Sequence, residues 1–183
     1  TAPSSKYGKS KLKSENLLTS NKKICSIIFR FFNVCSALKK PLIGEYHKPE
    51  THLIPIMISK FSKNVVMEIF GNDYNTKDGT CIRDYIHVVD LAQAHIIALE
   101  RLLNNKNASP MEIFNIGTGK GSSVLELIKA FEKASGEKLD YKITGRREGD
   151  ITSAYADTTR AKEILKWESK KTLEDALKDA WRW

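Results

Sequence analysis

The sequence predicts an α/β fold built on a doubly wound, mostly parallel sheet. Segments with strand-like and helix-like patterns alternate from one end of the chain to the other, which is typical of this class. Two strand-like segments, "ICSIIFRFF" (24–32) and "EIFNIG" (112–117), are almost continuously apolar, as expected of strands buried on both faces of a sheet. A complete sheet of this class needs more central strands than these two, so we expect the chain to be the second part of a larger unit.

The first half of the chain is predicted to begin with a helix. Pro3-Ser4-Ser5 is typical of a helix start, and residues 7–18 follow with helical spacing. The buried strand 24–32 comes next and ends at Asn33. The stretch 34–51 contains Pro41, Gly44 and Pro49 and therefore indicates an irregular loop. The remaining predicted elements of this half are a helix over 53–61, a short strand over 66–70 and a long polar loop over 71–85.

The second half is predicted to continue the alternation of helices and strands. Asp90 is the expected N-cap of an apolar-periodic helix over 91–103. Ser123-x-x-Glu126 resembles a capping box, and Thr172-x-x-Asp175 is a weaker variant of the same pattern. The expected elements after Asp90 are the strand 112–117, a helix from Ser123 to about Ala134, a strand near 139–144, the loop 145–150 and two short helices, the last starting at Thr172.

Charge and composition narrow the classes of function. The formal net charge of +8 is carried mostly by scattered lysines in doublets such as Lys39-Lys40, so we expect a solvated surface and no nucleic-acid partner. No apolar run reaches the length of a membrane span, and the first residues lack the apolar stretch of a secretory signal. The three cysteines, Cys25, Cys35 and Cys81, are odd in number and show no metal-ligand spacing. They predict free thiols, a cytoplasmic setting and no metal site.

Tyr7 and Lys11 have a spacing that suggests proton transfer. They lie one helical turn apart and therefore face the same way. The ordinary tyrosine pKa of about 10 is too high for a base at neutral pH, but a nearby ammonium favours the phenolate. Such a pair could take a proton from a hydroxyl while a hydride leaves the same carbon. An ordinary solvated helix face has the same spacing. The strand that follows ends in Arg30-Phe31-Phe32-Asn33, and ligands gather where strands of open sheets end, which favours the chemical interpretation.

Further segments extend the Tyr7-x-x-x-Lys11 motif, which is the catalytic motif of the short-chain dehydrogenase/reductases. In chain order they are "YGKSKLKSE", "RFFN", "ETHLIP", "IFGNDYNTKDGTCIRDYIHVVDLAQAH", "FNIGTGKGSSVLELI" and "RREGD". With them the chain resembles, over essentially its whole length, the C-terminal half of the UDP-galactose 4-epimerases (UDP-glucose 4-epimerases) of the extended short-chain dehydrogenase/reductase superfamily.

This resemblance implies the latter part of a Rossmann-like doubly wound parallel sheet with an interleaved smaller α/β substrate-binding domain. Residues 1–33 and 86–120 would end the NAD-binding domain, and residues 34–85 and 121–183 would form the nucleotide-sugar-binding domain. It also implies an isomerase that interconverts UDP-glucose and UDP-galactose by transient NAD-dependent oxidation at sugar carbon 4. The implied partners are a UDP-sugar, the missing N-terminal half of the same enzyme and a second copy in a homodimer.

The resemblance assigns roles to individual residues. Tyr7 would deprotonate the 4-hydroxyl of the sugar, and Lys11 would bind the nicotinamide ribose and keep Tyr7 acidic. Phe31 and Phe32 would pack beside the nicotinamide of NAD. Arg83 and Arg147 would hold the diphosphate, Asp150 the uridine ribose, and a small residue at Ala154 would leave room for an N-acetyl sugar. The implied substrate-binding residues are Asn33, His52, Leu53, Ile69, Phe70, Arg83, Tyr85, Arg147, Asp150 and Ala154.

Alternatives remain open for these assignments. Arg147 beside Glu148 also fits an exposed ion-pair cluster, Phe31 and Phe32 also fit the core, and His87 is interpreted as a structural histidine. The glycines of "NIGTGKGSS" (115–123) give neither a dinucleotide fingerprint nor a P-loop, so this segment is interpreted as a tight turn. The alternative functions are another nucleotide-sugar epimerase or dehydratase, or a non-catalytic nucleotide-sugar-binding fragment, because this chain alone is expected to be inactive.

Overall fold

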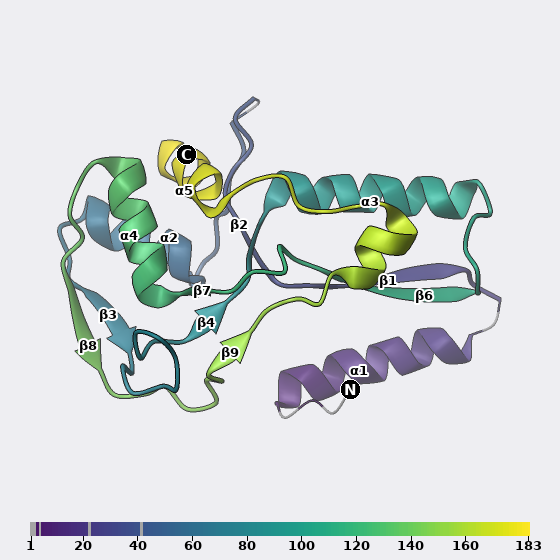
Figure 1. Ribbon diagram of the computed structural model, residues 1–183, viewed down its shortest axis with the longest axis horizontal. Helices are drawn as coiled ribbons and strands as arrows, with labels where there is room; N and C mark the ends of the chain where they lie inside the picture. Colours follow the sequence, from purple (N-terminus) through teal and green to yellow (C-terminus); the bar gives the residue numbers. More distant parts are fainter. Residues whose placement is uncertain (1–2, 4, 22, 41) are drawn as a thin grey trace.

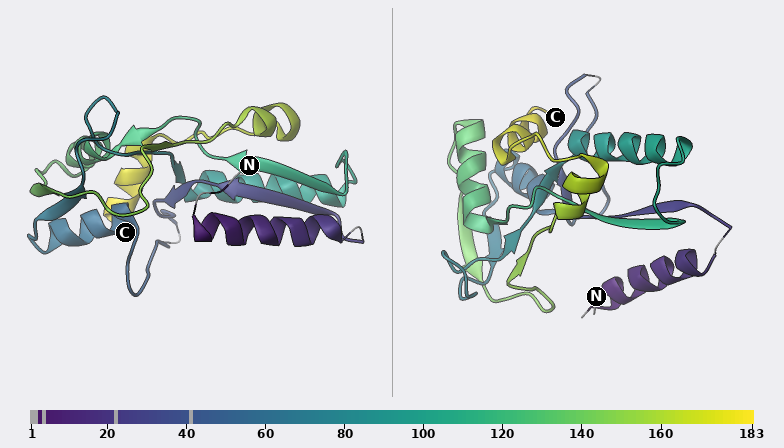
Figure 2. Two further views of the ribbon diagram at one scale, coloured as in Figure 1. Left: turned by 90° about the horizontal axis from the view of Figure 1, so that it is seen from below. Right: turned by 45° about the vertical axis from the view of Figure 1, so that its right-hand side comes forward.

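The computed structural model describes residues 3, 5–21, 23–40 and 42–183, and its α/β elements lie in two groups (Figure 1). In the first group two parallel strands lie between two long helices. These elements are β1 (Ser26–Phe31) and β6 (Met111–Ile116), with α3 (Val88–Leu103) on one side and α1 (Lys6–Ser20) on the other, an arrangement that Figure 2 shows from a second direction.

The second group packs three helices against a pair of parallel strands. Its elements are α2 (Leu53–Ser62), α4 (Val124–Ser135), α5 (Leu173–Arg182), β3 (Met67–Phe70) and β8 (Tyr141–Thr144). Short strands connect the groups. They are β2 (Asn33–Cys35) parallel to β5 (Tyr85–His87), and a three-stranded sheet in the order β7 (Ser122–Ser123), β4 (Ile82–Arg83) and β9 (Ser153–Ala154). The predicted α/β class with parallel strand pairing is confirmed.

Two apolar clusters form the core of the described chain. The first joins α2, α4 and α5 to β3, and in it the rings of Phe61, Phe131 and Trp181 meet edge to face with centroids 5.3–5.5 Å apart. Such aromatic pairs add about 0.5–1.5 kcal/mol each beyond the area they bury. The second cluster packs α3 against β6 together with a π-helical turn, η1 (Ala161–Leu165), and Trp167. The segment 161–167, expected in the second domain, thus packs on the first group, and the domain division itself stays a prediction.

Most of the predicted elements are present. Ser5 is the N-cap of α1, and both predicted capping boxes, at Ser123 and Thr172, are formed. Ser4, in the predicted helix start, and Pro41, in the predicted loop 34–51, lie outside the described residues. The predicted loops 34–51 and 71–85 contain β2, β4 and the start of β5, which are too short to produce a recognisable period.

Asp90 is not the N-cap of α3, contrary to the sequence prediction. The helix begins at Val88, and the N-cap is His87, whose Nδ1 accepts a hydrogen bond from the Val89 amide at 3.1 Å. The buried Asp90 carboxylate instead accepts the backbone amides of Lys170 and Lys171 at 3.0 and 2.9 Å. Asp90 therefore joins α3 to the segment before α5. His87 is buried and hydrogen-bonded to Ser36 Oγ at 2.9 Å, which confirms its structural interpretation.

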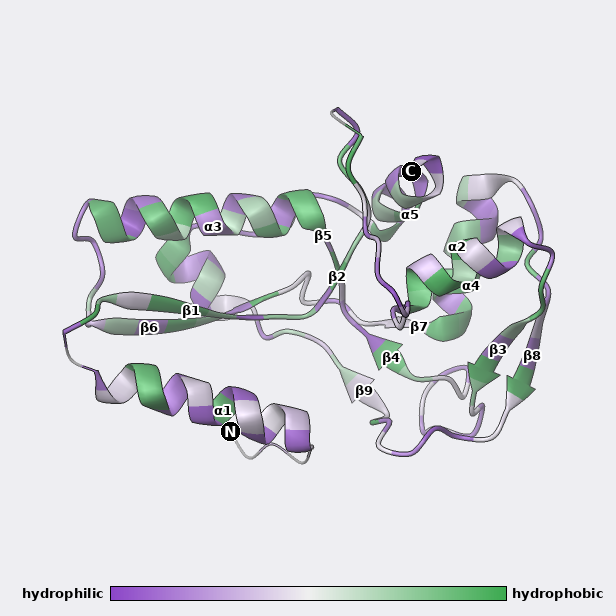
Figure 3. Cartoon of the chain, turned by 180° about the vertical axis from the view of Figure 1, so that it is seen from behind, coloured by the Kyte–Doolittle hydropathy of each residue, from purple (hydrophilic) through white to green (hydrophobic). Residues whose placement is uncertain are grey.

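The strand β1 is less buried than its apolar sequence predicts. Its residues are half-buried or exposed, although Figure 3 shows that the β1–β6 pair is largely hydrophobic. Within the described residues β1 pairs with β6 alone, and none of the residues of α1, all of which are described, is buried. Within the described residues one edge of the strand is thus unpaired, and the helix α1 beside it contributes no buried residue. Among the described residues, no helix is both long and apolar enough to cross a membrane.

Candidate active site

Tyr7 and Lys11 lie on one face of α1, as their spacing predicts. The helix begins just before them, because the side chain of Ser5 accepts a hydrogen bond from the Gly8 amide at 3.0 Å. The Lys11 Nζ lies 5.3 Å from the centroid of the Tyr7 ring, and the tyrosine is 71% exposed. The ammonium therefore lies beside the phenol ring, and the Tyr7 side chain is accessible.

A cavity of about 360 Å³ joins this pair to the end of β1. Tyr7, Lys11 and Phe31 line it together. Its wall is fixed by Glu15 of α1 and Arg30 of β1, which form two charge-assisted hydrogen bonds at 2.8 and 2.5 Å. The bond from Arg30, opposed by burial, lowers the pKa of Glu15 below its ordinary value. The ion pair thus orients α1 against β1 and holds Tyr7 beside Phe31.

The predicted cofactor residues Phe31 and Phe32 differ in their surroundings. Phe31, at the carboxyl end of β1, is 54% exposed and presents its ring to the cavity. Phe32 is half-buried between β1 and β2, and its amide donates to the Ile116 carbonyl at 3.0 Å. Asn33 follows at the start of β2 with an exposed side chain. The backbone amide of Asn33 is bonded to the Asp84 carbonyl, which leaves the side-chain amide accessible.

The residues predicted to hold the diphosphate and the uridine ribose form one cluster. Arg83 Nη2 and Arg147 Nη2 lie 3.5 and 2.9 Å from the same oxygen, Oδ1 of Asp150. Arg83 is further held by the Ile82 and Ile151 carbonyls at 2.8 Å. Arg147 is more exposed, and its guanidinium lies 5.9 Å from the ring centroid of Phe70. Two guanidinium groups of this kind suit phosphate oxygens.

Ala154 lies beside this cluster. It stands opposite Arg83 in the parallel pairing of β4 with β9, and its carbonyl accepts the Asp84 amide at 3.1 Å. Ala154 itself is half-buried. The short sheet β7–β4–β9 therefore brings Arg83, Asp150 and Ala154 to the same place, although 67 residues separate the first two.

Ile69 and Tyr85, both predicted to bind substrate, lie in the core of the described chain. Ile69 is 2% exposed and Tyr85 is 8% exposed, and both belong to the first apolar cluster. Burial raises the pKa of the Tyr85 hydroxyl well above its ordinary value. His52 and Leu53 begin α2, where His52 is exposed and Leu53 packs against the first cluster.

Asp84 is a key residue of this region that sequence reasoning missed. Its carboxylate is fully buried and accepts the backbone amides of Thr118, Gly119 and Ala156 at 2.9–3.1 Å, together with the Thr118 hydroxyl at 2.6 Å. The amides of the glycine turn are thus satisfied by a side chain of the protein itself. This confirms that 117–121 is a tight turn. No local spacing signals the contact, because more than 30 residues separate its partners.

The parallel α/β sheet and the tyrosine–lysine helix beside its strand ends place the chain among the Rossmann-like α/β proteins. Residues 1–117 match the model of the NAD dependent epimerase/dehydratase family, and the chain belongs to this family. It is 43% identical over 187 residues to the UDP-glucose 4-epimerase of Bacillus subtilis and 40% identical over 183 residues to that of Homo sapiens. The alignments cover 97% of this chain and 53% and 52% of those relatives. The chain therefore spans about half the length of the curated relatives it matches.

Solved structures agree with this assignment. A UDP-glucose 4-epimerase from Stenotrophomonas maltophila with bound NAD and formylated UDP-arabinopyranose matches all of this chain and 55% of its own, with a TM-score of 0.92 and 38% identity. The enzyme from Bifidobacterium longum in complex with NAD+ and UDP matches 97% of this chain and 53% of its own, with a TM-score of 0.88 and 36% identity. The fold of the chain is therefore that of the latter part of these enzymes.

Proposed function

We propose that the chain is the C-terminal part of an NAD-dependent UDP-glucose 4-epimerase, an isomerase of galactose metabolism that interconverts UDP-glucose and UDP-galactose. The observation that carries this proposal is the cavity in which Tyr7, Lys11 and Phe31 meet at the carboxyl end of β1. Ligands of open α/β sheets bind at such strand ends. The similarity to curated UDP-glucose 4-epimerases supports the specific substrate.

The residues of this cavity fit the nicotinamide end of NAD. The Tyr7 hydroxyl and the Lys11 ammonium offer hydrogen bonds to ribose hydroxyls, and the exposed Phe31 ring offers a flat apolar surface for the nicotinamide. When bound, NAD would take a hydride from carbon 4 of the sugar and return it to the other face of the ring. The rest of the chemistry is proton transfer, which falls to this chain.

Tyr7 is the proposed general base. Its hydroxyl oxygen, as the phenolate, takes the proton of the sugar 4-hydroxyl and gives it back in the second half of the cycle. Lys11 is the proposed partner of Tyr7 and of the nicotinamide ribose, and its Nζ lies 5.3 Å from the centroid of the Tyr7 ring. Because the sugar must present both faces in turn, it has to be held loosely, and the binding energy has to come from the nucleotide. Arg83 and Arg147 would supply that anchor by binding the diphosphate, while Asp150 accepts hydrogen bonds from the uridine ribose.

The test is a Tyr7→Phe substitution in the full-length enzyme. General acid–base catalysis contributes about 10²–10⁴-fold, so kcat for UDP-galactose should fall by that factor while bound NAD is retained. Tyr141→Phe is the matched control, because Tyr141 lies on β8 with an exposed side chain and should leave kcat unchanged. A Tyr7→Phe enzyme with unaltered kcat would exclude this mechanism.

The small side chain of Ala154 supports a second substrate. We propose that the enzyme also epimerises UDP-N-acetylgalactosamine, because Ala154 lies beside the Arg83 anchor and leaves space for an N-acetyl group. Ala154→Tyr should abolish turnover of the N-acetyl sugar and largely preserve that of UDP-galactose, which separate coupled assays measure. Equal loss with both sugars would argue against a selective role.

A second candidate function is nucleotide-sugar binding without turnover by this chain as it stands. The observation that favours it is the exposure of Tyr7 and Phe31, which lie at the centre of the proposed site and are 71% and 54% exposed.

We also propose that the enzyme is a cytosolic homodimer. The free thiols support the compartment: Cys35 and Cys81 are buried, and burial raises the pKa of Cys35 to about 12. Light scattering of the full-length enzyme tests the dimer.

A further inference from the structure

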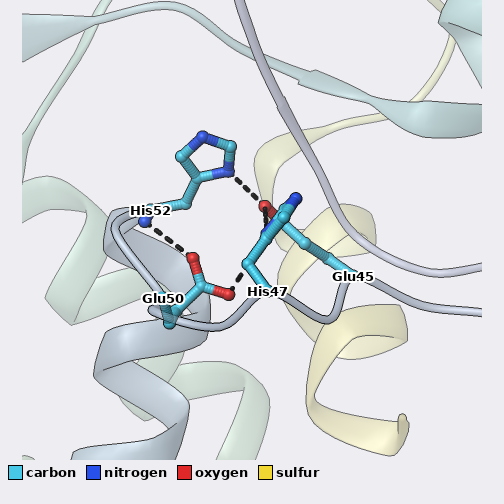
Figure 4. Close-up of side chains that lie close together, drawn as sticks. All are labelled: Glu45, His47, Glu50 and His52. Carbon is cyan, nitrogen blue, oxygen red and sulfur yellow. Dashed lines mark hydrogen bonds and ion pairs between the residues drawn. The ribbon is translucent and has the colours of Figure 1, made fainter.

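Four potential metal ligands converge on the loop that leads into α2. They are Glu45, His47, Glu50 and His52, and their ligand atoms all lie within 4.8 Å of one another. Figure 4 shows the two carboxylates and the two imidazole rings turned toward a common point. The side chains come from a single stretch of eight positions with the pattern Glu-x-His-x-x-Glu-x-His. The sequence predicts no metal site, since its cysteines lack ligand spacing and the resemblance implies a substrate-binding role for His52.

Two of the distances between these atoms are those of ligands around one small cation. His47 Nδ1 lies 3.3 Å from Glu45 Oε1 and 3.4 Å from Glu50 Oε2. His52 Nδ1 contacts the same oxygen of Glu45. Around Zn²⁺, bonds of about 2.0–2.2 Å in a tetrahedron place neighbouring ligand atoms about 3.3–3.6 Å apart. His47 and the two carboxylates are therefore already spaced as two edges of such a tetrahedron.

The carboxylate of Glu50 is oriented before any cation arrives. Its Oε1 accepts the backbone amides of Thr51 and His52 at 2.8 Å each, which leaves Oε2 directed at His47. Partners that fix a ligand in this way are the usual support of a metal site.

Nearby cations do not neutralise the cluster in the described structure. Lys48 stands between the ligands in sequence, but its Nζ lies over the ring of Tyr46 at 5.3 Å from the centroid. The side chains of Glu45 and Glu50 are only 17% and 21% exposed, whereas those of His47 and His52 are 51% and 56% exposed. The two carboxylates are thus partly shielded from water, and the two imidazoles above them are accessible. The carboxylates can attract a cation, and the cation can reach them from the solvent past the imidazoles.

We propose that Glu45, His47, Glu50 and His52 form a binding site for a divalent transition-metal ion, with Zn²⁺ as the best-matched ion. Two imidazole nitrogens and two carboxylate oxygens suit Zn²⁺, whereas Mg²⁺ and Ca²⁺ prefer oxygen ligands alone. The ion would tie the loop 45–52 to the start of α2. The site involves neither Tyr7 nor Lys11, and it shares only His52 with the residues that the resemblance implies for substrate binding.

Calorimetric titration of the chelator-treated 183-residue chain with Zn²⁺ alone tests the site. We expect saturable binding of a single ion per chain. His47→Gln and His52→Gln should each weaken the affinity by at least about tenfold, because even the loss of a supporting partner commonly costs 10–100-fold. His95→Gln is the matched control: His95 is an exposed histidine on α3 that bonds the Leu91 carbonyl, and its loss should change the affinity by less than about twofold.

A second measurement separates a real site from scattered surface binding. Zn²⁺ should slow amide hydrogen exchange of residues 44–52 in the unaltered chain and leave it unchanged in His47→Gln, with far-UV circular dichroism showing that the variant is folded. Co²⁺ should give the visible absorption of tetrahedral coordination in the unaltered chain alone. Absence of saturable binding, or equal affinity in the unaltered chain and His47→Gln, would show that the cluster is only a set of histidine–glutamate hydrogen bonds.

Discussion

Two adjacent arginines in the loop after β8 have different tasks. Arg147 shares Asp150 with Arg83 and lies near the ring of Phe70. Arg146 instead bonds Asp73 at 2.7 Å and lies over the ring of Tyr74 at 4.2 Å from the centroid. A ligand phosphate that reaches Asp150 would meet Arg147, whereas Arg146 fastens the loop to the residues after β3. A comparison of the two arginines can therefore separate the proposed ligand-binding role of Arg147 from the structural role of Arg146.

Arg147→Ala in the full-length enzyme should raise KM for UDP-galactose by about tenfold to hundredfold, because one charge-assisted contact to the diphosphate is lost. The kcat should change much less, since Arg147 does not line the cavity that holds Tyr7. Steady-state kinetics measure both. Arg146→Ala is the control and should leave KM within about threefold. If the two substitutions raised KM equally, the assignment of Arg147 to the diphosphate would be wrong.

At this scale the sequence identifies residues that act through local spacing. Tyr7 and Lys11 are four positions apart on one helix, so their common face follows from helical geometry. Ile69 could not be recognised as core from a strand of four residues, whose period is too short to assign a face. The contacts of Asp84 depend on how distant segments fold together, and no local pattern encodes that. The Glu45–His52 cluster does have a local pattern, but its convergence on one point depends on the fold of the loop.

At the scale of elements, α3 and β6 are joined by a buried ion pair. Arg101, in the last turn of α3, donates to both carboxylate oxygens of Glu112 on β6 at 2.7 and 2.9 Å. The Ala108 amide also donates to this carboxylate. The bond from Arg101, against the opposing effect of burial, lowers the pKa of Glu112. This ion pair therefore holds the end of α3 against the start of β6.

The lowered pKa of Glu112 predicts acid sensitivity. A carboxyl whose folded-state pKa lies below the unfolded value stabilises the fold above the unfolded pKa, about 4.3, and this stabilisation is lost as the pH falls through the folded value. Glu112→Gln should lower the free energy of unfolding by about 1.5–3 kcal/mol at pH 7 and show a flatter decline below pH about 4.3. Denaturant unfolding of this chain across that range measures both effects.

Glu68→Gln is the control for the acid sensitivity. Glu68 pairs with Lys142 across β3 and β8, and the side chains are 42% and 60% exposed, so solvent screens the interaction. Its loss should change the unfolding free energy much less than the loss of Glu112 does. An equal effect of the two substitutions would contradict the importance of burial at Glu112.

The elements themselves are largely predictable from sequence because most of them carry local signals. The capping boxes at Ser123 and Thr172 mark the helix starts correctly, and the apolar runs locate β1 and β6. The prediction that Asp90 is an N-cap was wrong because an aspartate in the first turn of a helix and an aspartate at its N-cap cannot be told apart in the sequence. The short strands β2, β4, β7 and β9 have two or three residues each, and tertiary pairing alone creates them.

At the scale of the whole molecule, the described chain presents an incomplete site. The core clusters lie away from α1, and the cavity of Tyr7 is lined by Pro3 and by residues of α1 and β1. The half-buried state of β1 agrees with the edge that is unpaired within the described residues. The sequence predicted this incompleteness from its small number of central strands. It could not predict how the segment 161–167 crosses to the first group, because that path depends on packing around Trp167.

The 183-residue chain on its own should therefore retain no NAD after gel filtration and should show no epimerisation of UDP-galactose. Tyr7 and Phe31 remain exposed to water, and water weakens both the electrostatic and the packing interactions that catalysis requires. The full-length enzyme, assayed in parallel, should retain NAD and epimerise UDP-galactose. Robust epimerisation by the chain alone would contradict this view of the site.

The buried carboxylate of Asp84 also affects where an anion can bind near Arg83. The amides of Thr118 and Gly119 in the glycine turn donate to the Asp84 carboxylate. Backbone amides grouped in this way attract anions, and here a side chain of the protein itself occupies them. An incoming diphosphate, as proposed, would therefore find these donors already occupied and would be left to the guanidinium groups of Arg83 and Arg147.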